Sequence, residues 1–290
     1  MIRRPVREKV QYITPDGVKF NLHDPPNKGV YNLDGVGLPP RTYRSVAGPY
    51  QHGERVISAA LDPRTISFSF RHNGFSRSDL WGNRDTLTDI LRINRPSDPD
   101  TYAPFNNPEP GQLKFFYLQD GELVVRAIDV YLNGGVTYRD SDDIYAIQED
   151  LTFTAYNPLF YDPTPVEVEL EVGNNTITYE GNWEEYPTIV VDDQVENFAI
   201  QNTDTLYYMD LQYTSAAAEI ITFDLSYGIK DVYNDSGDSL LSYLTLSSNL
   251  INFNLQPHPV VEDGENVLQV TLDSGTPTIT MTYYNRYLSL

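Results

Sequence analysis

Glu184 and Glu185 are the residues whose types could most directly support catalysis, because they are adjacent carboxylates between two aromatic side chains. Two carboxylates about 5 to 9.5 Å apart can cleave a glycosidic bond. That separation depends on the fold, and a chain with 41 acidic residues contains many such pairs by chance. Trp183 and Tyr186 could stack on the face of a sugar or cover the edge of a sheet. We therefore name Trp183 and Tyr186 as candidate glycan-facing aromatics and predict no catalytic residue.

The other residue types that carry chemistry form no recognisable centre. The chain has no cysteine, which excludes disulfides, thiolate metal sites and cysteine nucleophiles. Its four histidines lack the spacing that a metal-binding helix provides; they are His23, His52, His72 and His258. The sequence contains neither a nucleophile elbow nor a phosphate-binding loop. We predict a protein that is not an enzyme and that holds no metal or cofactor.

Two acidic clusters, Asp140–Asp143 and Asp231–Asp238, have the composition of calcium ligands. An EF-hand loop requires carboxylates at fixed positions around an invariant glycine. Ile144 and Tyr145 break this pattern in the first cluster, and Val232 stands at the first ligand position in the second. Because Asn, Asp, Ser and Gly also favour hairpin turns, we predict solvent-exposed turns at both places.

Charge divides the chain into two parts. The net charge is −21, and 18 of the 20 Lys and Arg residues precede residue 161. Residues 1–160 are therefore nearly neutral, with 20 acidic residues, whereas residues 161–290 carry 2 basic and 21 acidic residues. Three prolines between Tyr156 and Pro165 prevent a helix or a central strand from running through the junction. We predict two domains with these boundaries, and the negative charge argues against nucleic-acid binding.

Alternation of apolar and polar residues predicts strands in the first domain. The segments are Thr65–Arg71, Gln112–Tyr117, Leu123–Val130 and Gln148–Ala155. Asp120-Gly121 separates the second from the third and is a strong signal for a two-residue hairpin. We expect a β-sandwich-like unit.

One helix, near residues 78–94, interrupts this pattern. Ser78 is the expected N-cap, and the apolar stripe consists of Leu80, Trp81, Leu87, Ile90 and Leu91. Pro96–Gly111, which is rich in Pro, is predicted as a long loop. Ile13–Pro40 is similar, with Pro, Gly and Asn between short strand-like pieces, and both segments are expected to reach beyond the domain's own core.

The second domain shows short strand-like segments from end to end, including Ser242–Ser247 and Ile251–Leu255, separated by Gly, Asn and Asp turns. This pattern predicts an antiparallel β-sandwich with jelly-roll topology. No apolar stretch is long enough to span a bilayer, and the first residues lack the apolar core of a signal peptide. We expect no membrane insertion and a chain that is cytoplasmic where it is made.

Several segments, taken in order, resemble the distal tail protein family of long-tailed bacteriophages. The segment Gly181–Val191 has the family's Gly, followed by a Pro that opens an apolar strand. Further similar segments are Asn197–Thr205, Gly237–Leu241 and Gly264–Leu268 in the second domain, and Arg55–Ile57, Arg64–Phe68 and Phe153–Phe160 in the first. The sequence departs from the family where Gln256–Asp263 lengthens a turn and no Pro precedes Gly264.

The resemblance implies a structural protein of the virion tail tip. Its first domain would close into a homohexameric ring between the tail tube protein and the tail hub or tail-associated fibre protein. Its second domain would be a galectin-like or carbohydrate-module-like sandwich, with a receptor-binding protein or a host saccharide as a further partner. The alternative function is that of a glycan-binding module or adhesin that recognises saccharide on the host cell surface. An enzyme acting on cell-wall polysaccharide is the third interpretation.

Overall fold

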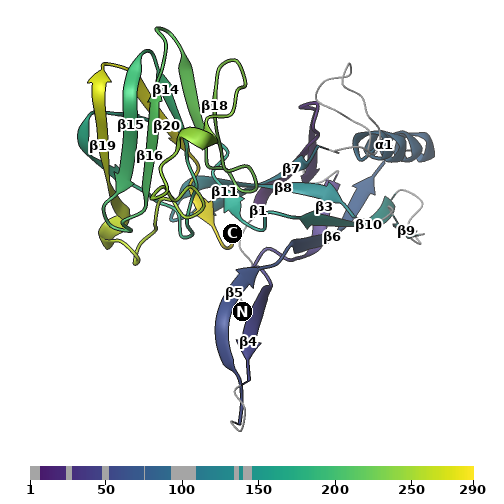
Figure 1. Ribbon diagram of the computed structural model, residues 1–290. Coiled ribbons are helices and arrows are strands. Elements are labelled where there is room, and N and C mark those ends of the chain that lie inside the picture. The colour runs from purple at the N-terminus through teal and green to yellow at the C-terminus, as the bar shows by residue number, and fades with distance from the viewer. Residues whose placement is uncertain are drawn as a thin grey trace. The chain divides into compact units, whose positions relative to one another are not determined.

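A computed structural model describes residues 7–23, 28–47, 52–74, 76–92, 109–133, 137–139 and 146–290 (Figure 1). The chain is mainly β, with 55% of its residues in strands. It divides into two compact units, Met1–Tyr161 with Leu288–Leu290, and Asp162–Tyr287. The predicted mainly β, two-domain fold class is confirmed.

The first unit is built around antiparallel strands in the order β2-β1-β7-β8-β10-β6-β3, with β9 beside β10 and β11 beside β8. The strands are β1 (Arg7–Ile13), β2 (Lys19–His23), β3 (Lys28–Asp34), β6 (Arg64–Asn73), β7 (Gly111–Gln119), β8 (Glu122–Leu132), β9 (Thr137–Arg139), β10 (Ala146–Ala155) and β11 (Phe160–Tyr161). Strands β8 and β10 meet only over a short stretch, so the sheet folds into two halves. Aromatic side chains fill the space between the halves: the ring centres of Tyr12 and Phe153 are 5.6 Å apart, and those of Phe20 and Phe70 are 6.3 Å apart.

The hairpin predicted at Asp120-Gly121 is confirmed. It joins β7 to β8, and both residues have positive φ, 52° and 92°. A two-residue turn of this kind matches the twist of the flanking strands. The short strand-like pieces expected within Ile13–Pro40 are β2 and β3, which pair with the main sheet, so this segment is more regular than a long loop. In β2, burial of Phe20 and Leu22 alternates with more exposed neighbours. Of the predicted loop Pro96–Gly111, only the last three residues belong to the described part of the chain.

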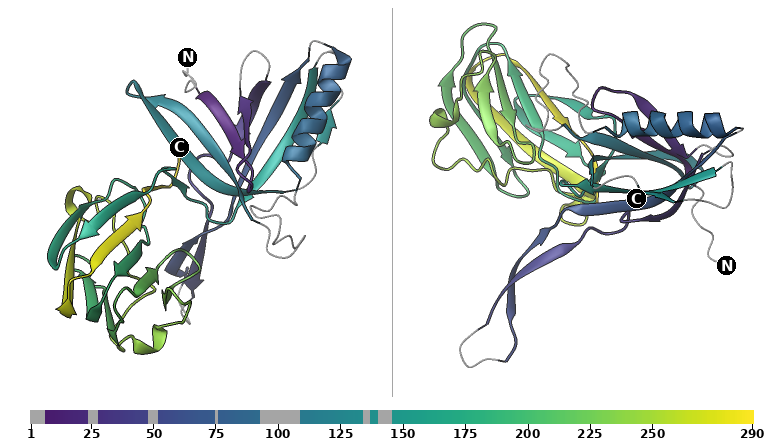
Figure 2. Two further views of the ribbon diagram at one scale, coloured as in Figure 1. Left: turned by 90° about the horizontal axis from the view of Figure 1, so that it is seen from above. Right: turned by 90° about the vertical axis from the view of Figure 1, so that its right-hand side faces the viewer.

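Helix α1 (Arg77–Ile90) packs against β6 and starts earlier than predicted (Figure 2). The side chain of Ser76, not that of Ser78, accepts a hydrogen bond from the backbone N–H of Asp79 at 3.1 Å, so the cap lies two residues upstream. The helix ends at Ile90, where Leu91 leaves the helical conformation. Trp81 is not in the buried stripe, since it is 47% exposed. It follows the buried Leu80 by one residue and is therefore rotated by about 100° around the helix.

Two further strands of the first unit, β4 (Arg41–Val46) and β5 (Arg55–Leu61), form a separate two-stranded sheet. We call this hairpin the arm. It projects from the main sheet of its unit, and no layer formed by the described residues of that unit lies beneath it (Figures 1 and 2). Every residue of β4 is exposed, and so is every residue of β5 except the last.

The second unit is a sandwich of two antiparallel sheets. One has the order β12-β20-β14-β17-β18 and the other β13-β19-β15-β16. The strands are β12 (Val166–Leu170), β13 (Gly173–Thr178), β14 (Thr188–Asp192), β15 (Val195–Asn202), β16 (Tyr208–Thr214), β17 (Ile220–Asp224), β18 (Asp231–Asn234), β19 (Glu265–Gly275) and β20 (Thr278–Tyr283), with the short β21 (Arg286–Tyr287) at the end. Phe198 and Phe223 meet between the sheets with ring centres 5.3 Å apart, and one continuous apolar core surrounds them.

Three expectations for the second domain need correction. The strands predicted at Ser242–Ser247 and Ile251–Leu255 are instead a 3-10 turn, Leu241–Tyr243, and irregular chain. These segments make only isolated bridges, such as Leu211 with Leu244, and Leu246 is fully exposed, so no alternating burial develops. The last three residues, Leu288–Leu290, were assigned by sequence to the second domain but belong to the first unit.

The first unit also includes Tyr161, one residue beyond the predicted boundary. Its hydroxyl donates a hydrogen bond of 2.5 Å to Asp129 on β8, which fixes it there. Over the residues that the structure describes, none of the helices combines the length and the apolar character needed to cross a membrane.

Candidate functional site

The segment between Gly181 and Pro187 places Glu184 and Glu185 in different surroundings. Glu185 is 5% exposed and forms an ion pair with Arg286, with 2.7 Å between the carboxylate and Nε. Glu184 accepts hydrogen bonds from the hydroxyl of Tyr186 and from the side-chain amide of Asn254, both at 3.1 Å. Burial raises the pKa of the Glu185 carboxyl, while the guanidinium of Arg286 acts in the opposite direction. Both carboxylates are therefore engaged in contacts that hold the sandwich together.

Tyr186 is half-buried at the edge of the same core. The ammonium of Lys230 lies 3.3 Å from the centre of its ring, and the ring of Tyr227 meets it edge-on at 6.0 Å. Burial raises the pKa of Tyr186 to about 12 and lowers the pKa of Lys230 to about 8. One face of the tyrosine is thus covered by a cation of the same unit.

Trp183 is half-buried, and its backbone carbonyl accepts a hydrogen bond of 2.6 Å from the hydroxyl of Tyr179. The structure therefore places Trp183 and Tyr186 in one short segment, in which Tyr186 already has an aromatic and a cationic neighbour. Their role as glycan-facing aromatics stays a prediction.

The acidic segment Asp231–Asp238 consists of β18 (Asp231–Asn234) and the turn that follows it. Asn234 Oδ1 accepts a hydrogen bond of 2.8 Å from the backbone N–H of Asp238, and Gly237 has φ of +83°. Asn and Gly therefore act here as turn residues. The other cluster, Asp140–Asp143, lies outside the described residues. Within the described ranges, no group of three or more His, Cys, Asp or Glu side chains is arranged to hold a metal ion.

The arm of the first unit is the largest feature that sequence reasoning missed. Tyr43, Val56 and Ile57 are 58%, 56% and 64% exposed, although each is large and apolar. The pairing of β4 with β5 shifts register between Arg44 and Ser45, and Ile57 is passed over on the opposite strand. Two-stranded hairpins are at best marginally stable alone, and open strand edges are templates for pairing with another chain. The arm is thus a surface that no other described part of its unit covers.

The base of the arm is firmly attached. The hydroxyl of Thr42 donates a hydrogen bond of 2.6 Å to the carboxylate of Asp62, and the backbone N–H of Asp62 bonds the carbonyl of Pro40 at 3.0 Å. The chain leaves β3 at Gly35, which has φ of +82°, and an added Cβ there would lie 1.9 Å from the carbonyl oxygen of Thr65. Only glycine fits this close approach, so the sequence fixes where the arm departs from the sheet.

The charges of the arm and of the second unit are opposite. The arm carries Arg41, Arg44 and Arg55 against Glu54. In the second unit, the two cations are committed internally: Arg286 pairs with Glu185, and Lys230 lies on Tyr186. Lys230 also donates a hydrogen bond of 2.7 Å to a backbone carbonyl. The outward charge of the second unit is therefore carried almost wholly by carboxylates.

Comparison with known proteins supports a tail or baseplate role. Residues 180–287 match the family model of the siphovirus-type tail component, C-terminal domain. Among solved structures, SPP1 Dit (gp 19.1), described as a paradigm of the hub adsorption apparatus in phages that infect Gram-positive bacteria, is similar with a TM-score of 0.66 at 14% identity. That match covers 96% of this chain and 98% of the other. No curated protein sequence matches the chain.

A chain of the phage P2 baseplate, in its activated conformation with Ca, is also similar, with a TM-score of 0.52 at 8% identity and coverage of 97% and 99%. At these identities the two structures show a shared fold. The family match covers residues 180–287, which make up most of the second unit. Over its whole length the chain shares the fold of SPP1 Dit, and the resemblance to the distal tail proteins is confirmed.

Proposed function

We propose that the chain is a distal tail adaptor whose first unit closes into a homohexameric ring. The ring joins the tail tube protein to the tail hub or its associated fibre protein, and it carries the receptor-binding apparatus. In this proposal the chain has no catalytic step, acts at the virion tail tip and is assembled in the host cytoplasm. Its function is to hold other proteins in a fixed geometry.

The exposed arm is the observation that carries this proposal. A cyclic ring is made of head-to-tail contacts, in which one surface of each subunit meets a different surface of the next. Such contacts need a part of the subunit that reaches outward. The arm has open strand edges and three large exposed apolar side chains on a fixed base. Burying these side chains against a neighbouring copy would supply about 25 cal/mol for each Å² of apolar surface removed from water.

The distribution of charge favours the same arrangement. A nearly neutral first unit can pack against identical copies without strong self-repulsion, whereas units with 2 basic and 21 acidic residues repel one another. The second unit therefore suits the periphery of an assembly better than a shared interface.

Substitution within the arm tests the proposal. In light scattering, the wild-type chain should have about six times the mass of one chain, and the double variant Val56→Ser/Ile57→Ser should shift toward single chains. Leu206→Ser is the matched control, because Leu206 is 71% exposed but belongs to the second unit. Equal masses for all three proteins would contradict a role of the arm in assembly.

Glycan binding by the second unit remains the alternative function, with Trp183 and Tyr186 as the candidate residues. Retention of the chain on a glycan column, lost in Trp183→Ala, would support that function. If the retained protein were also a single chain, the alternative would replace the ring.

A further inference from the structure

Arg64 lies at the base of the arm and is almost fully buried, with 1% of its surface exposed. Its guanidinium stacks on the ring of Phe160, 4.5 Å from the ring centre. Nη1 donates hydrogen bonds to the carbonyls of Gly35 (3.1 Å) and Gly37 (2.8 Å), and Nη2 donates one to the carbonyl of Leu288 (2.6 Å). Arg64 thus connects the loop that leads into the arm to a residue 224 positions later in the chain.

These contacts depend more on the planar geometry of the guanidinium than on its positive charge. The three acceptors are backbone carbonyls, and Nε has no hydrogen-bond partner among the described residues. Burial lowers the pKa of Arg64 to about 10. Burying a cation without a carboxylate partner is costly. A planar guanidinium, however, can hold several carbonyls at once in one fixed geometry.

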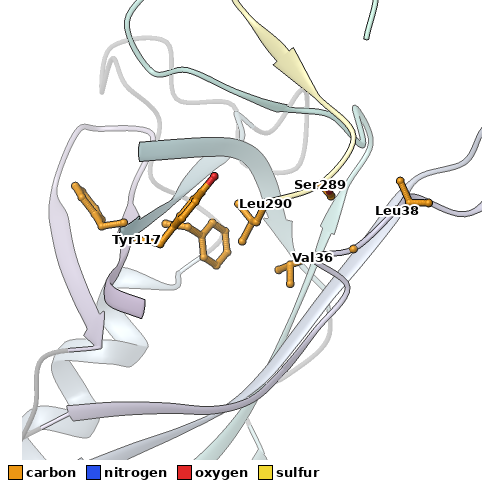
Figure 3. A pocket seen from close by; sticks show the side chains of 8 residues that line it. Val36, Leu38, Tyr117, Ser289 and Leu290 are labelled. Atoms are coloured by element: carbon orange, nitrogen blue, oxygen red, sulfur yellow. The ribbon is translucent and has the colours of Figure 1, made fainter. Parts of the chain in front are cut away.

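The last residues of the chain make a second contact with the same loop. The backbone N–H of Leu290 donates a hydrogen bond of 3.2 Å to the carbonyl of Val36. Ser289 and Leu290 also line an apolar pocket of about 460 Å³ together with Val36, Leu38 and residues of β7. Figure 3 shows Leu290 between Val36 and Tyr117. Ser289 and Leu290 therefore pack against the loop that leads into the arm.

We propose that Leu288–Leu290 is a latch that, through Arg64, fixes the arm in the position needed for contact with a second copy of the chain. This inference rests on the proposed function, in which the arm is the contact between copies. Residues 162–287 separate the first unit from the latch in the sequence. A variant that lacks Leu288–Leu290 keeps the arm but loses these contacts with the loop at its base.

Hydrogen exchange measured by mass spectrometry tests the latch in the full-length protein. The variants are Arg64→Met, deletion of Leu288–Leu290, and both changes together. Arg92→Met is the control, because Arg92 is an exposed arginine just after α1. We expect amides in residues 35–40 and 61–65 to exchange about tenfold faster in either single variant, since one hydrogen bond to a charged group is worth about that factor.

The double variant should exchange faster than Arg64→Met alone, because the deletion also removes the hydrogen bond from Leu290 to Val36. The combined effect should be smaller than the product of the two single effects, because both changes break the contact between Arg64 and Leu288. Wild-type exchange at the base of the arm after deletion of the tail would overturn the proposal. If Arg64→Met does not fold, Arg64→Lys replaces it: the charge stays, the planar fork is lost, and the same acceleration is expected.

Light scattering of the same samples separates this inference from the proposed function. Faster exchange together with loss of assembly in the tail deletion supports both. A wild-type chain that does not assemble contradicts the ring and with it the function of the latch, even if exchange shows that the linkage exists. A tail deletion that assembles like the wild type overturns the latch and leaves the ring intact.

Discussion

The arm of the first unit exposes its large apolar side chains, whereas the sandwich of the second unit buries them. In the sandwich, Phe198, Ile221 and Phe223 are fully buried between two sheets. In the arm, Tyr43 and Ile57 face solvent on a two-stranded sheet. The sandwich thus buries its apolar side chains within its own unit. The apolar side chains of the arm would be buried only if another surface covered them. A protein that stabilises one part internally and leaves another exposed has the organisation expected of an assembly component.

The charges differ in the same sense. The second unit commits its only two cations, Lys230 and Arg286, to internal contacts and presents carboxylates outward. The arm presents Arg41, Arg44 and Arg55. The negatively charged second unit should therefore repel other copies of itself. The arm, which carries three arginines, does not add to this negative charge.

The largest expected effect comes from breaking the buried ion pair of the second unit. Glu185→Ala leaves the guanidinium of Arg286 buried without its partner, which typically costs about 3 to 5 kcal/mol. Denaturant unfolding followed by the fluorescence of Trp183, in a Trp81→Phe background, reports this unit selectively. Glu169→Ala, at an exposed position of β12, should change little. An unchanged midpoint for Glu185→Ala would show that the sandwich does not depend on the pair.

The same substitution at two isoleucines compares the sandwich and the arm directly. Ile221→Ala removes a fully buried side chain and should cost the second unit about 2 to 5 kcal/mol. Ile57→Ala removes a side chain that is 64% exposed and should change stability by less than about 0.5 kcal/mol in the single chain. The order should reverse in a measurement of assembly, where only Ile57→Ala weakens association. Equal effects on association would remove the distinction between the two regions.

Salt should stabilise the two units unequally. Raising the ionic strength from about 0.1 M to 1 M shortens the screening length from about 10 Å to 3 Å. Repulsion among the 21 carboxylates of the second unit falls accordingly, so its unfolding midpoint should rise. The nearly neutral first unit should respond much less. Parallel thermal scans that follow Trp183 and Trp81 in single-tryptophan variants measure the difference, and equal shifts would contradict the electrostatic contrast.

The smallest expected effect concerns Lys230, whose pKa burial lowers from 10.5 to about 8. Between these two values the unfolded chain retains the proton that the folded chain has released, so the free energy of unfolding increases with pH. Stability of the second unit should therefore rise between about pH 8 and pH 9.5, before most tyrosines ionise. Lys230→Met should lack this rise. A variant that keeps the full wild-type pH dependence would show that Lys230 is not responsible for it.

Features set by local chemistry could be predicted from the sequence. Asp120-Gly121 specifies its hairpin because both residues accept positive φ, and the alternating segments around it became β7 and β8. The start of α1 was missed by two residues because Ser76 and Ser78 are equally good caps. The short strands β2 and β3 show only as strand-like pieces in the sequence, because Pro, Gly and Asn surround them.

Features set by distant contacts could not be predicted. Strands β4 and β5 contain Tyr and β-branched residues, as other strands do. Only the rest of the fold decides that, among the described residues, no second layer lies beneath them. Glu185 and Arg286 are 101 residues apart, so their pairing has no local signal. The same holds for Leu288–Leu290, where the carbonyl of Leu288 accepts a hydrogen bond from the buried guanidinium of Arg64, 224 residues earlier.

The most direct test of the central claim is negative-stain electron microscopy of the purified full-length chain. Class averages should show closed rings with sixfold symmetry, and rings should become scarce in Val56→Ser/Ile57→Ser. Single particles of about 33 kDa in the wild-type sample, or rings that persist unchanged in the arm variant, would contradict assembly through the exposed arm.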